Sequence, residues 1–160
     1  MNWNQRIKEL LTGEWVIASK VNNNKVLDVN GNDGSYNVRI WDKSNADNQK
    51  WTVEFDSTNR AFVIRSVAYR NKVLARISTN KAAGVNVIVS DYGTNNPIDM
   101  GQRWYLHYNC NDYYTLANYV GDYLNPMVLD LYGSNTNNGA NIQVFPFHGK
   151  DNQCFSFIRQ

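Results

Sequence analysis

Two aspartates stand at matching places in similar words of the sequence, Asp28 in "KVLDV" and Asp130 in "MVLDL". A pair of carboxylates is what a glycoside hydrolase needs, held a fixed distance apart across the bond that is cleaved. Here the two aspartates lie far apart in the chain, each in its own copy of a repeated unit. No nucleophile–base motif and no glycine-rich phosphate loop is found in the sequence. The residues therefore predict a protein that is not an enzyme.

Cysteine and histidine give no sign of a metal centre. The sequence has two cysteines, Cys110 and Cys154, and no Cys/His cluster has zinc-ligand spacing. Two thiols make no disulfide framework, so we expect both to be free. Cys154 is the middle residue of a repeated word in which the other copies have Lys50 and Arg103. This exchange predicts an outward-facing side chain at this position. Because no cluster has the spacing of metal ligands, we expect no metal and no cofactor.

Length and charge limit the class of protein. The chain has 160 residues, of which 42% are hydrophobic and 13% aromatic, enough for one domain with a core. The net charge of +2 is spread over scattered residues, whereas nucleic-acid binders usually show a clustered basic stripe. No apolar run reaches the roughly 18 residues that a membrane helix needs. We therefore expect neither nucleic-acid binding nor membrane insertion.

The first twelve residues differ from the rest of the chain. They contain no apolar stretch long enough for a secretory signal. The alternatives are that the chain is cytoplasmic, that it is exported by another route, that it is a mature or cloned fragment, or that it is one piece of a larger assembly. Trp3, Ile7, Leu10 and Leu11 have the spacing of one face of a short helix. We expect this helix to cover a sheet edge or a barrel end; a docking helix for a partner is the alternative.

A four-residue word returns three times, as "NQKW" at 48–51, "GQRW" at 101–104 and "NQCF" at 152–155. Its aromatic residues are separated by 53 and then 51 positions. The apolar words "KVLDV", "KVLAR" and "MVLDL" recur in the same phase, each followed by a further strand: "NVRIW", "NVIVS" and "NIQVF". Several features in phase indicate a chain built from three copies of one unit.

Each unit has the pattern of four short strands, because apolar and polar residues alternate with period two between polar turns. Short strands without crossover helices imply antiparallel pairing. No unit has enough apolar residues to fold alone, so the three must share one core. We predict an all-β domain over residues 13–160 after an N-terminal extension at 1–12. Its repeats fall at about 13–58, 59–109 and 110–160.

The three Q-x-aromatic words, the "VLD" words and the strand rhythm together resemble the ricin B-chain-type lectin family over about residues 13–160. The resemblance implies a β-trefoil, a six-stranded barrel capped by three hairpins, with three pseudo-symmetric four-stranded repeats. Closing the barrel would remove most free sheet edges. Trp51, Trp104 and Phe155 would then fill the core near the threefold axis. The glutamine of each word would bond backbone or loop groups, because buried amides need partners.

The family builds a sugar site from three kinds of side chain. A carboxylate accepts hydrogen bonds from hydroxyls, an aromatic ring covers the apolar face of the sugar, and an amide both donates and accepts. In the first repeat the resemblance assigns these roles to Asp28, Trp41 and Asn48, with Gln49 behind them. Arg39 stands where this family often has glutamine. Its guanidinium could pair with Asp28, either orienting the carboxylate or competing with the ligand.

The third repeat carries the fullest set of these residues: Asp130, Gln143, Phe145, Asn152 and Gln153. The stretch "FPFHGKDNQ" at 145–153 resembles the loop of an active site in this family, where a histidine contributes a polar contact. That role falls on His148. We expect removal of Asp130 to abolish binding in this repeat with little change in the thermal midpoint.

The second repeat has lost the set, with Ala75, Ser90 and Gly101 at the three positions and an inserted "TNNPIDMG" in its loop. No sugar site is expected there. Turn capping by the aspartates and ordinary sheet packing by the aromatics are the alternative interpretations. Two repeats keep all three roles together while one loses all three, and this correlation favours ligand binding.

The resemblance therefore implies a lectin for galactose or N-acetylgalactosamine, with shallow sites in the first and third repeats. Such modules serve in this family as haemagglutinins and as cell-attachment parts of toxins. We accordingly expect glycans as ligands and other chains of a toxin or haemagglutinin complex as partners. The expected location is extracellular, reached without a recognisable signal peptide or by release within a complex. The alternative is a trefoil scaffold with vestigial sugar sites that docks other protein chains.

Overall fold

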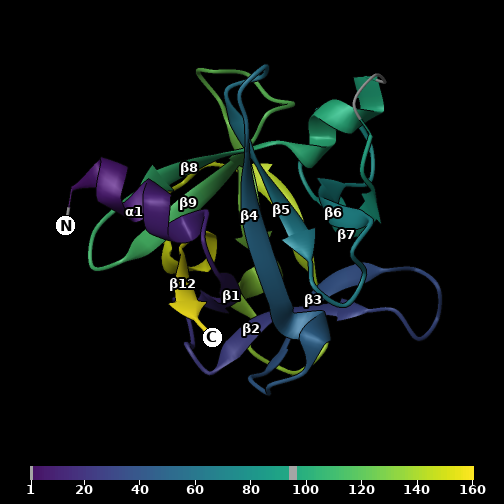
Figure 1. Cartoon of the computed structure of the whole chain (residues 1–160). Helices are drawn as coiled ribbons and strands as arrows, with labels where there is room; N and C mark the ends of the chain where they lie inside the picture. Colours follow the sequence, from purple (N-terminus) through teal and green to yellow (C-terminus); the bar gives the residue numbers. More distant parts are fainter. Residues whose placement is uncertain (1, 94–96) are drawn as a thin grey trace.

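The computed structural model describes residues 2–93 and 97–160 and shows an all-β protein with one short α-helix (Figure 1). Within these residues the strands join into one hydrogen-bonded sheet. In chain order they are β1 (Glu14–Ser19), β2 (Lys25–Asn30), β3 (Asn37–Asp42), β4 (Lys50–Asp56), β5 (Ala61–Ser66), β6 (Lys72–Arg76), β7 (Val85–Asp91), β8 (Trp104–Tyr108), β9 (Tyr113–Asn118), β10 (Met127–Leu131), β11 (Ile142–Pro146) and β12 (Phe155–Arg159). The predicted all-β class is confirmed.

Six of the strands close on themselves to form a barrel. β1 pairs antiparallel with both β12 and β4, and β5 links β4 to β8. β9 then joins β8 back to β12, which completes the ring. A closed ring of strands has no edge strand, so the barrel offers no unpaired backbone edge to other chains.

The remaining strands form the hairpins β2–β3, β6–β7 and β10–β11. One strand of each hairpin pairs with the barrel: β2 with β1, β6 with β5, and β10 with β9. The other strands, β3, β7 and β11, pair with one another where the hairpins meet. A closed barrel capped by hairpins in this way is the architecture of a β-trefoil.

Three asparagine side chains form a closed hydrogen-bonded ring where the hairpins meet. Asn37 Nδ2 donates to Asn141 Oδ1 (3.0 Å), Asn141 Nδ2 to Asn86 Oδ1 (2.8 Å), and Asn86 Nδ2 to Asn37 Oδ1 (2.7 Å). The three are the first residues of the words "NVRIW", "NVIVS" and "NIQVF". The ring pairs amide groups that are half-buried and would otherwise need other partners. It ties together three segments that are distant in sequence.

The aromatic residues of the repeated word lie in the core, as predicted. Trp51, Trp104 and Phe155 are each 0% exposed and belong to one apolar cluster. The two indoles differ in their hydrogen bonding. Trp104 Nε1 donates to the Leu74 carbonyl at 2.9 Å, whereas the buried Trp51 Nε1 has no hydrogen-bond partner among the described residues.

The glutamine of each word bonds the backbone, also as predicted. Gln102 Oε1 accepts from the Gly93 N–H at 3.1 Å, and its Nε2 donates to the Asp91 carbonyl at 2.7 Å. Gln49 and Gln153 make the same two kinds of bond in their own repeats. Each glutamine therefore holds the loop after the third strand of its repeat against the start of the fourth.

The prediction that the middle residue of the word points outward is wrong. Arg103 is 2% exposed, and its Nε donates to Asp56 Oδ2 at 2.6 Å. Burial alone would raise the pKa of Asp56, but hydrogen bonds from Asn59 and Arg103 outweigh this effect and lower it to about 2. Arg103 is thus half of a buried ion pair between β4 and the beginning of β8.

Cys154, the middle residue of the third repeated word, is buried as well. It is 6% exposed because neighbouring loops cover it: the Asn109 amide and the Lys150 carbonyl lie 3.6 and 3.7 Å from its sulfur. Burial raises the pKa of this thiol, so it is protonated at neutral pH. Cys110 is exposed, and both cysteines are free, as expected. Sequence spacing could not reveal which loops lie over this part of the barrel.

The N-terminal helix α1 (Trp3–Leu10) begins with a capping box, in which Asn2 and Gln5 exchange hydrogen bonds. It lies beside β8 and β9 (Figure 1), with Leu10 in the core and Ile7 packed against it. Trp3 and Leu11 are 43% and 39% exposed, so only part of the predicted apolar face is covered. In the described part of the chain no helix is long and apolar enough to cross a membrane. The division at residue 13 stays a prediction.

Candidate functional site

The third-repeat residues lie on the outward face of the β10–β11 hairpin. In the antiparallel register Asp130 is opposite Gln143, and Val128 is opposite Phe145. The residues between them are buried in the core: Leu129, Leu131, Ile142 and Val144. Successive side chains of a strand point to opposite faces, so Asp130 and Phe145 share the outer face of the hairpin.

The Asp130 carboxylate is 2% exposed and accepts hydrogen bonds from three amides. Its Oδ1 accepts from Gln143 Nε2 at 3.0 Å. Its Oδ2 accepts from Asn152 Nδ2 at 3.0 Å and from Gln153 Nε2 at 2.9 Å. These bonds fix the carboxylate in one orientation. The expectation that Asp130 could be removed at little cost in stability does not fit this burial, because its amide donors would lose their acceptor.

An aromatic ring and an imidazole lie beside this carboxylate. Phe145 is 36% exposed, and its ring centroid is 6.2 Å from that of His148. His148 Nε2 lies 3.5 Å from Asp130 Oδ2. The Lys150 N–H donates to His148 Nδ1 at 3.2 Å, which assigns the proton of the neutral ring to Nε2. An N–H donor, a carboxylate and an exposed ring therefore meet at the surface of the third repeat.

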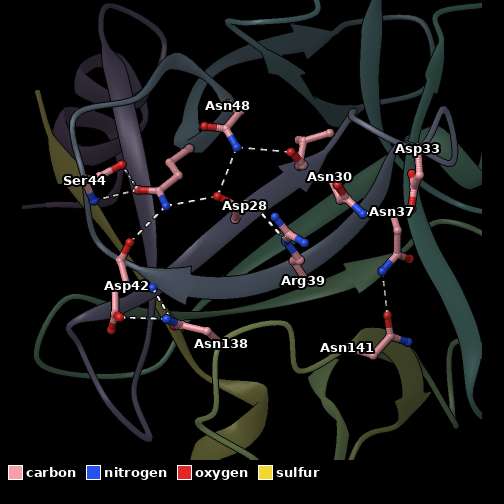
Figure 2. Close-up of polar contacts among 12 residues, drawn as sticks. Asp28, Asn30, Asp33, Asn37, Arg39, Asp42, Ser44, Asn48, Asn138 and Asn141 are labelled. Atoms are coloured by element: carbon pink, nitrogen blue, oxygen red, sulfur yellow. Dashed lines mark hydrogen bonds and ion pairs between the residues drawn. The ribbon is translucent and has the colours of Figure 1, made fainter.

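The first repeat has the same arrangement around Asp28, which is 3% exposed. Asn48 Nδ2 and Gln49 Nε2 each donate to Asp28 Oδ2 at 3.0 Å, as their counterparts do to Asp130. Figure 2 shows Asn48 and Arg39 pointing toward Asp28 from two different segments. The difference is at Arg39, whose Nε donates to Asp28 Oδ1 at 2.9 Å in place of a glutamine amide.

The Arg39 guanidinium also lies over the aromatic ring of the first repeat. Its central carbon lies 4.2 Å from the centroid of the Trp41 ring, a cation–π distance. A Cβ atom added to Gly139 would lie 3.7 Å from Trp41 Cζ3, so the 138–140 segment lies against the same ring. Arg39 thus contacts the same carboxylate oxygen that Gln143 contacts in the third repeat, and its guanidinium lies over the ring that a ligand would use. Of the two roles expected for Arg39, this geometry favours competition with the ligand.

The second repeat replaces the carboxylate arrangement with another hydrogen bond. Ala75 is buried and offers no acceptor, and Gln102 Nε2 donates instead to Ser90 Oγ at 2.9 Å. Gly101 stands where the other repeats have asparagine. The serine hydroxyl therefore takes the place of the missing carboxylate as the acceptor for the glutamine.

A buried arginine fills the space beside Gly101. A Cβ atom at Gly101 would lie only 2.9 Å from Arg76 Cγ. Arg76 is 2% exposed and donates to the carbonyls of Ser78 (2.7 Å) and Val120 (2.8 Å). A side chain at 101 is thus excluded by packing. Of the insertion at 94–101, residues 94–96 lie outside the described part of the structure.

Two of the predicted site residues act from behind the carboxylates. Gln49 and Gln153 are 1% and 0% exposed, so they position Asp28 and Asp130 and do not face a ligand. Among the described residues no group of three or more His, Cys, Asp or Glu side chains could hold a metal ion. What each arrangement offers a ligand is a fixed hydrogen-bond acceptor beside an apolar ring, which suits a molecule with hydroxyls on its edge and C–H groups on one face.

A β-trefoil of this kind is the fold of ricin-type, lectin-type domains, as comparison with known proteins shows. Residues 2–90 match the family model described as "Ricin-type beta-trefoil lectin domain-like". The chain belongs to this family of ricin-type β-trefoil lectin domains.

Individual relatives agree with the family match. The chain is 27% identical over 137 residues to the "Main hemagglutinin component" of types C and D, from Clostridium botulinum C phage and D phage. The match covers 86% of this chain but only 44% of those relatives. The designed threefold-symmetric protein ThreeFoil superposes with a TM-score of 0.79 at 24% identity, covering 92% of this chain and 99% of ThreeFoil. A Macrolepiota procera ricin B-like lectin in complex with lactose superposes with a TM-score of 0.73 at 17% identity, and the match covers 92% of this chain and 95% of that lectin.

Sequence reasoning missed a surface feature next to the third-repeat residues. Tyr105 and His107 alternate in the word "WYLHY", and both point outward from β8. The alternation could have shown their outward direction. Their closeness to the β10–β11 hairpin follows only from the pairing of β8 with β9 and of β9 with β10.

Proposed function

We propose that this chain binds glycans ending in galactose or N-acetylgalactosamine, and that the third repeat carries the working site. The observation that carries the proposal is the Asp130 carboxylate, fixed by three amides and placed beside the exposed Phe145 ring. Vicinal hydroxyls of a sugar would donate to the carboxylate, and the apolar face of the sugar would lie on the ring. His148 Nε2 would supply a donor to a further hydroxyl.

The repetition of this constellation supports ligand binding over turn capping. Asp28 and Asp130 accept the same pattern of amide bonds and stand beside aromatic rings of equal exposure, 36% for both Trp41 and Phe145. A capping role needs no exposed ring at this place. No catalytic role is proposed, since the two aspartates belong to different hairpins and each is held by donors of its own repeat.

The site is tested by calorimetric titration with galactose and N-acetylgalactosamine, with glucose as the epimeric control. Lactose, the ligand in a fold neighbour, is a suitable second probe. Phe145→Ala should weaken galactose binding about tenfold, because the contact with the ring contributes roughly 1.4 kcal/mol to the binding free energy and this corresponds to a factor of about ten in affinity. Phe55→Ala is the matched control, because Phe55 is a 49% exposed phenylalanine on β4. Equal affinity of the wild type and Phe145→Ala would contradict the proposed site.

Arg39→Gln should open the first repeat to ligand. Gln143 shows that glutamine at this position can donate to the aspartate Oδ1, and glutamine carries no cation to cover Trp41. We expect the calorimetric stoichiometry to rise from one galactose per chain to two. Retention on a multivalent galactose surface should rise more than tenfold, because two sites on one rigid body gain avidity.

The matched control for this change is Arg65→Gln, which removes an arginine from the second repeat, where no site is expected. Its stoichiometry should stay at one galactose per chain. Two galactose molecules bound per wild-type chain would show that Arg39 does not block the first repeat.

The setting of the protein is part of the proposal. Glycans with terminal galactose are displayed outside cells, so we propose an extracellular role. The curated relatives are named as haemagglutinin components, and the chain spans less than half of their length. We therefore propose that it acts as one component of a haemagglutinin or toxin assembly, with other protein chains as partners. Purification from its source and identification of the co-eluting chains would test this.

A further inference from the structure

Two adjoining cavities form a groove on the outer surface of β8, β9 and the 119–126 loop. The first, of about 270 Å³, reaches from Val128 and Phe147 to His107. The second, of about 650 Å³, continues from His107 to Tyr105 and Tyr119. The lining residues common to both are His107, Ala117 and Pro126. The shared lining residues place the two cavities next to each other along one surface, which we call the groove.

Strand register connects this groove to the third-repeat site. One row of directly paired residues crosses four strands: Phe145 on β11, Val128 on β10, Ala117 on β9 and Tyr105 on β8. Three interstrand steps separate the ends of the row, roughly 14 Å along the sheet. The aromatic ring proposed to carry the terminal sugar is therefore the first member of a row that ends on a second aromatic ring. The distance between them exceeds the length of one monosaccharide.

The groove has an apolar floor and aromatic walls. Ala117 and Val128 are 3% and 1% exposed and leave the floor low because their side chains are small. At the far end the Tyr105 and Tyr119 rings are stacked, with centroids 5.5 Å apart and 25° between their planes. At the near end Phe147 is 52% exposed, and its N–H donates to the Pro126 carbonyl at 3.0 Å. Such surfaces suit the C–H faces of sugar rings, with polar edges supplied by His107 and Asn109.

The corresponding row of the first repeat is covered. It runs through Trp41, Val26, Ala18 and Ser156. Val26 and Ala18 are both 0% exposed, and Ile158, which holds the place of His107, packs over them. Serine stands in place of Tyr105. The same floor residues are thus present without an open groove above them and without an aromatic end.

The row of the second repeat is filled by a charged side chain. It runs through Ser90, Val73, Arg65 and Thr52. Arg65 replaces the small floor residue and forms two bonds to Glu54, of 2.6 and 3.0 Å. Of the three rows, all within the described residues, only that of the third repeat has an aromatic residue at both ends with a valine and an alanine between them.

We propose that this groove is an extended subsite that takes the second and third sugars of an oligosaccharide whose terminal residue lies at Asp130 and Phe145. The proposal rests on the proposed function, since the terminal sugar fixes which part of the glycan reaches the groove. The ligand is then an oligosaccharide, and binding by the third repeat depends on the sugars behind the terminal galactose.

The test compares free galactose with di- to tetrasaccharides that end in galactose through different linkages, titrated into the same preparations. We expect at least one tri- or tetrasaccharide to bind the wild type about tenfold more tightly than galactose, the ratio given by 1.4 kcal/mol. Tyr105→Ala should lose this difference while its affinity for galactose stays unchanged. Tyr105→Phe keeps the ring and should keep the difference. Thr52→Ala changes the same row position in the second repeat and is the matched control.

His107→Ile is a second variant. It places an isoleucine over Ala117 and Val128, as Ile158 lies over Ala18 and Val26 in the first repeat. It should remove the oligosaccharide preference and leave galactose binding intact. If no oligosaccharide binds the wild type more tightly than galactose, or if Tyr105→Ala and His107→Ile both keep the preference, the subsite is overturned and the galactose site stands. If the wild type binds galactose and every galactose-terminated oligosaccharide no better than glucose, the proposed function itself fails.

Discussion

Galactose binding by the third repeat should fall by on the order of 100-fold or more when Asp130 is replaced with alanine, because charge-assisted hydrogen bonds to two hydroxyls are lost. The same change should lower the free energy of unfolding by about 3 kcal/mol. Asn152, Gln153 and Gln143 each donate to this buried carboxylate, and alanine leaves one hydrogen of each without its acceptor. Calorimetry measures the first effect, and urea unfolding followed by tryptophan fluorescence measures the second.

The second repeat shows how the stability can be recovered without the binding. There Ala75 is accompanied by Ser90, whose hydroxyl accepts from Gln102 Nε2 at 2.9 Å. The double variant Asp130→Ala, Phe145→Ser reproduces this pair in the third repeat. Because the new hydroxyl can accept from the Gln153 amide, the double variant should be more stable than Asp130→Ala, and it should still bind no galactose. Such coupling between neighbours appears as a departure from additivity in a double-mutant cycle.

Two outcomes would contradict this account of Asp130. Retained galactose affinity in the single variant would show that the carboxylate does not contact the ligand. A stability equal to that of the wild type would show that the three amides find other partners at no cost.

Trp104→Ala should lower the free energy of unfolding by about 3–5 kcal/mol, although no ligand is expected in its repeat. Trp104 is 0% exposed in the shared core, and its Nε1 donates to the Leu74 carbonyl. The loss combines the cavity left by the indole with an unpaired buried carbonyl. Galactose affinity of the remaining folded protein should be unchanged, because the third-repeat site lies on another hairpin. Denaturant unfolding and calorimetry on the same sample separate the two effects.

The matched comparison is between phenylalanine substitutions at the two tryptophans. Phe155 stands at the end of the third repeated word, where the other two words have Trp51 and Trp104, and it shows that the core accommodates a phenylalanine at this place. Trp51→Phe removes an indole nitrogen that has no partner, whereas Trp104→Phe also leaves the Leu74 carbonyl unpaired. We therefore expect Trp51→Phe to cost less than Trp104→Phe by roughly 1 kcal/mol, the net value of one hydrogen bond. Equal costs would show that the indole bond of Trp104 contributes nothing.

The burial of the two aspartates could not be read from the sequence. The words "KVLDV" and "MVLDL" place each aspartate on the outer face of a strand, where an exposed carboxylate is the ordinary expectation. In the structure the 3₁₀ turns Asp47–Gln49 and Asp151–Gln153 bring two amides over each carboxylate. These turns lie about twenty residues further along the chain, and their position depends on the barrel and hairpin packing together.

The sequence alone determined that the chain is an all-β protein with a thrice-repeated word, because period-two alternation and equal spacing are local or countable features. It also determined which repeats keep a carboxylate, a ring and an amide. Only the tertiary structure decided that Arg39 lies over the Trp41 ring, that Arg103 and Cys154 are buried, and that an open groove leads from Val128 and Phe147 to Tyr105. Each of these depends on contacts between segments distant in sequence, and such contacts are set when the barrel closes and the hairpins pack, not by the residues next in the chain.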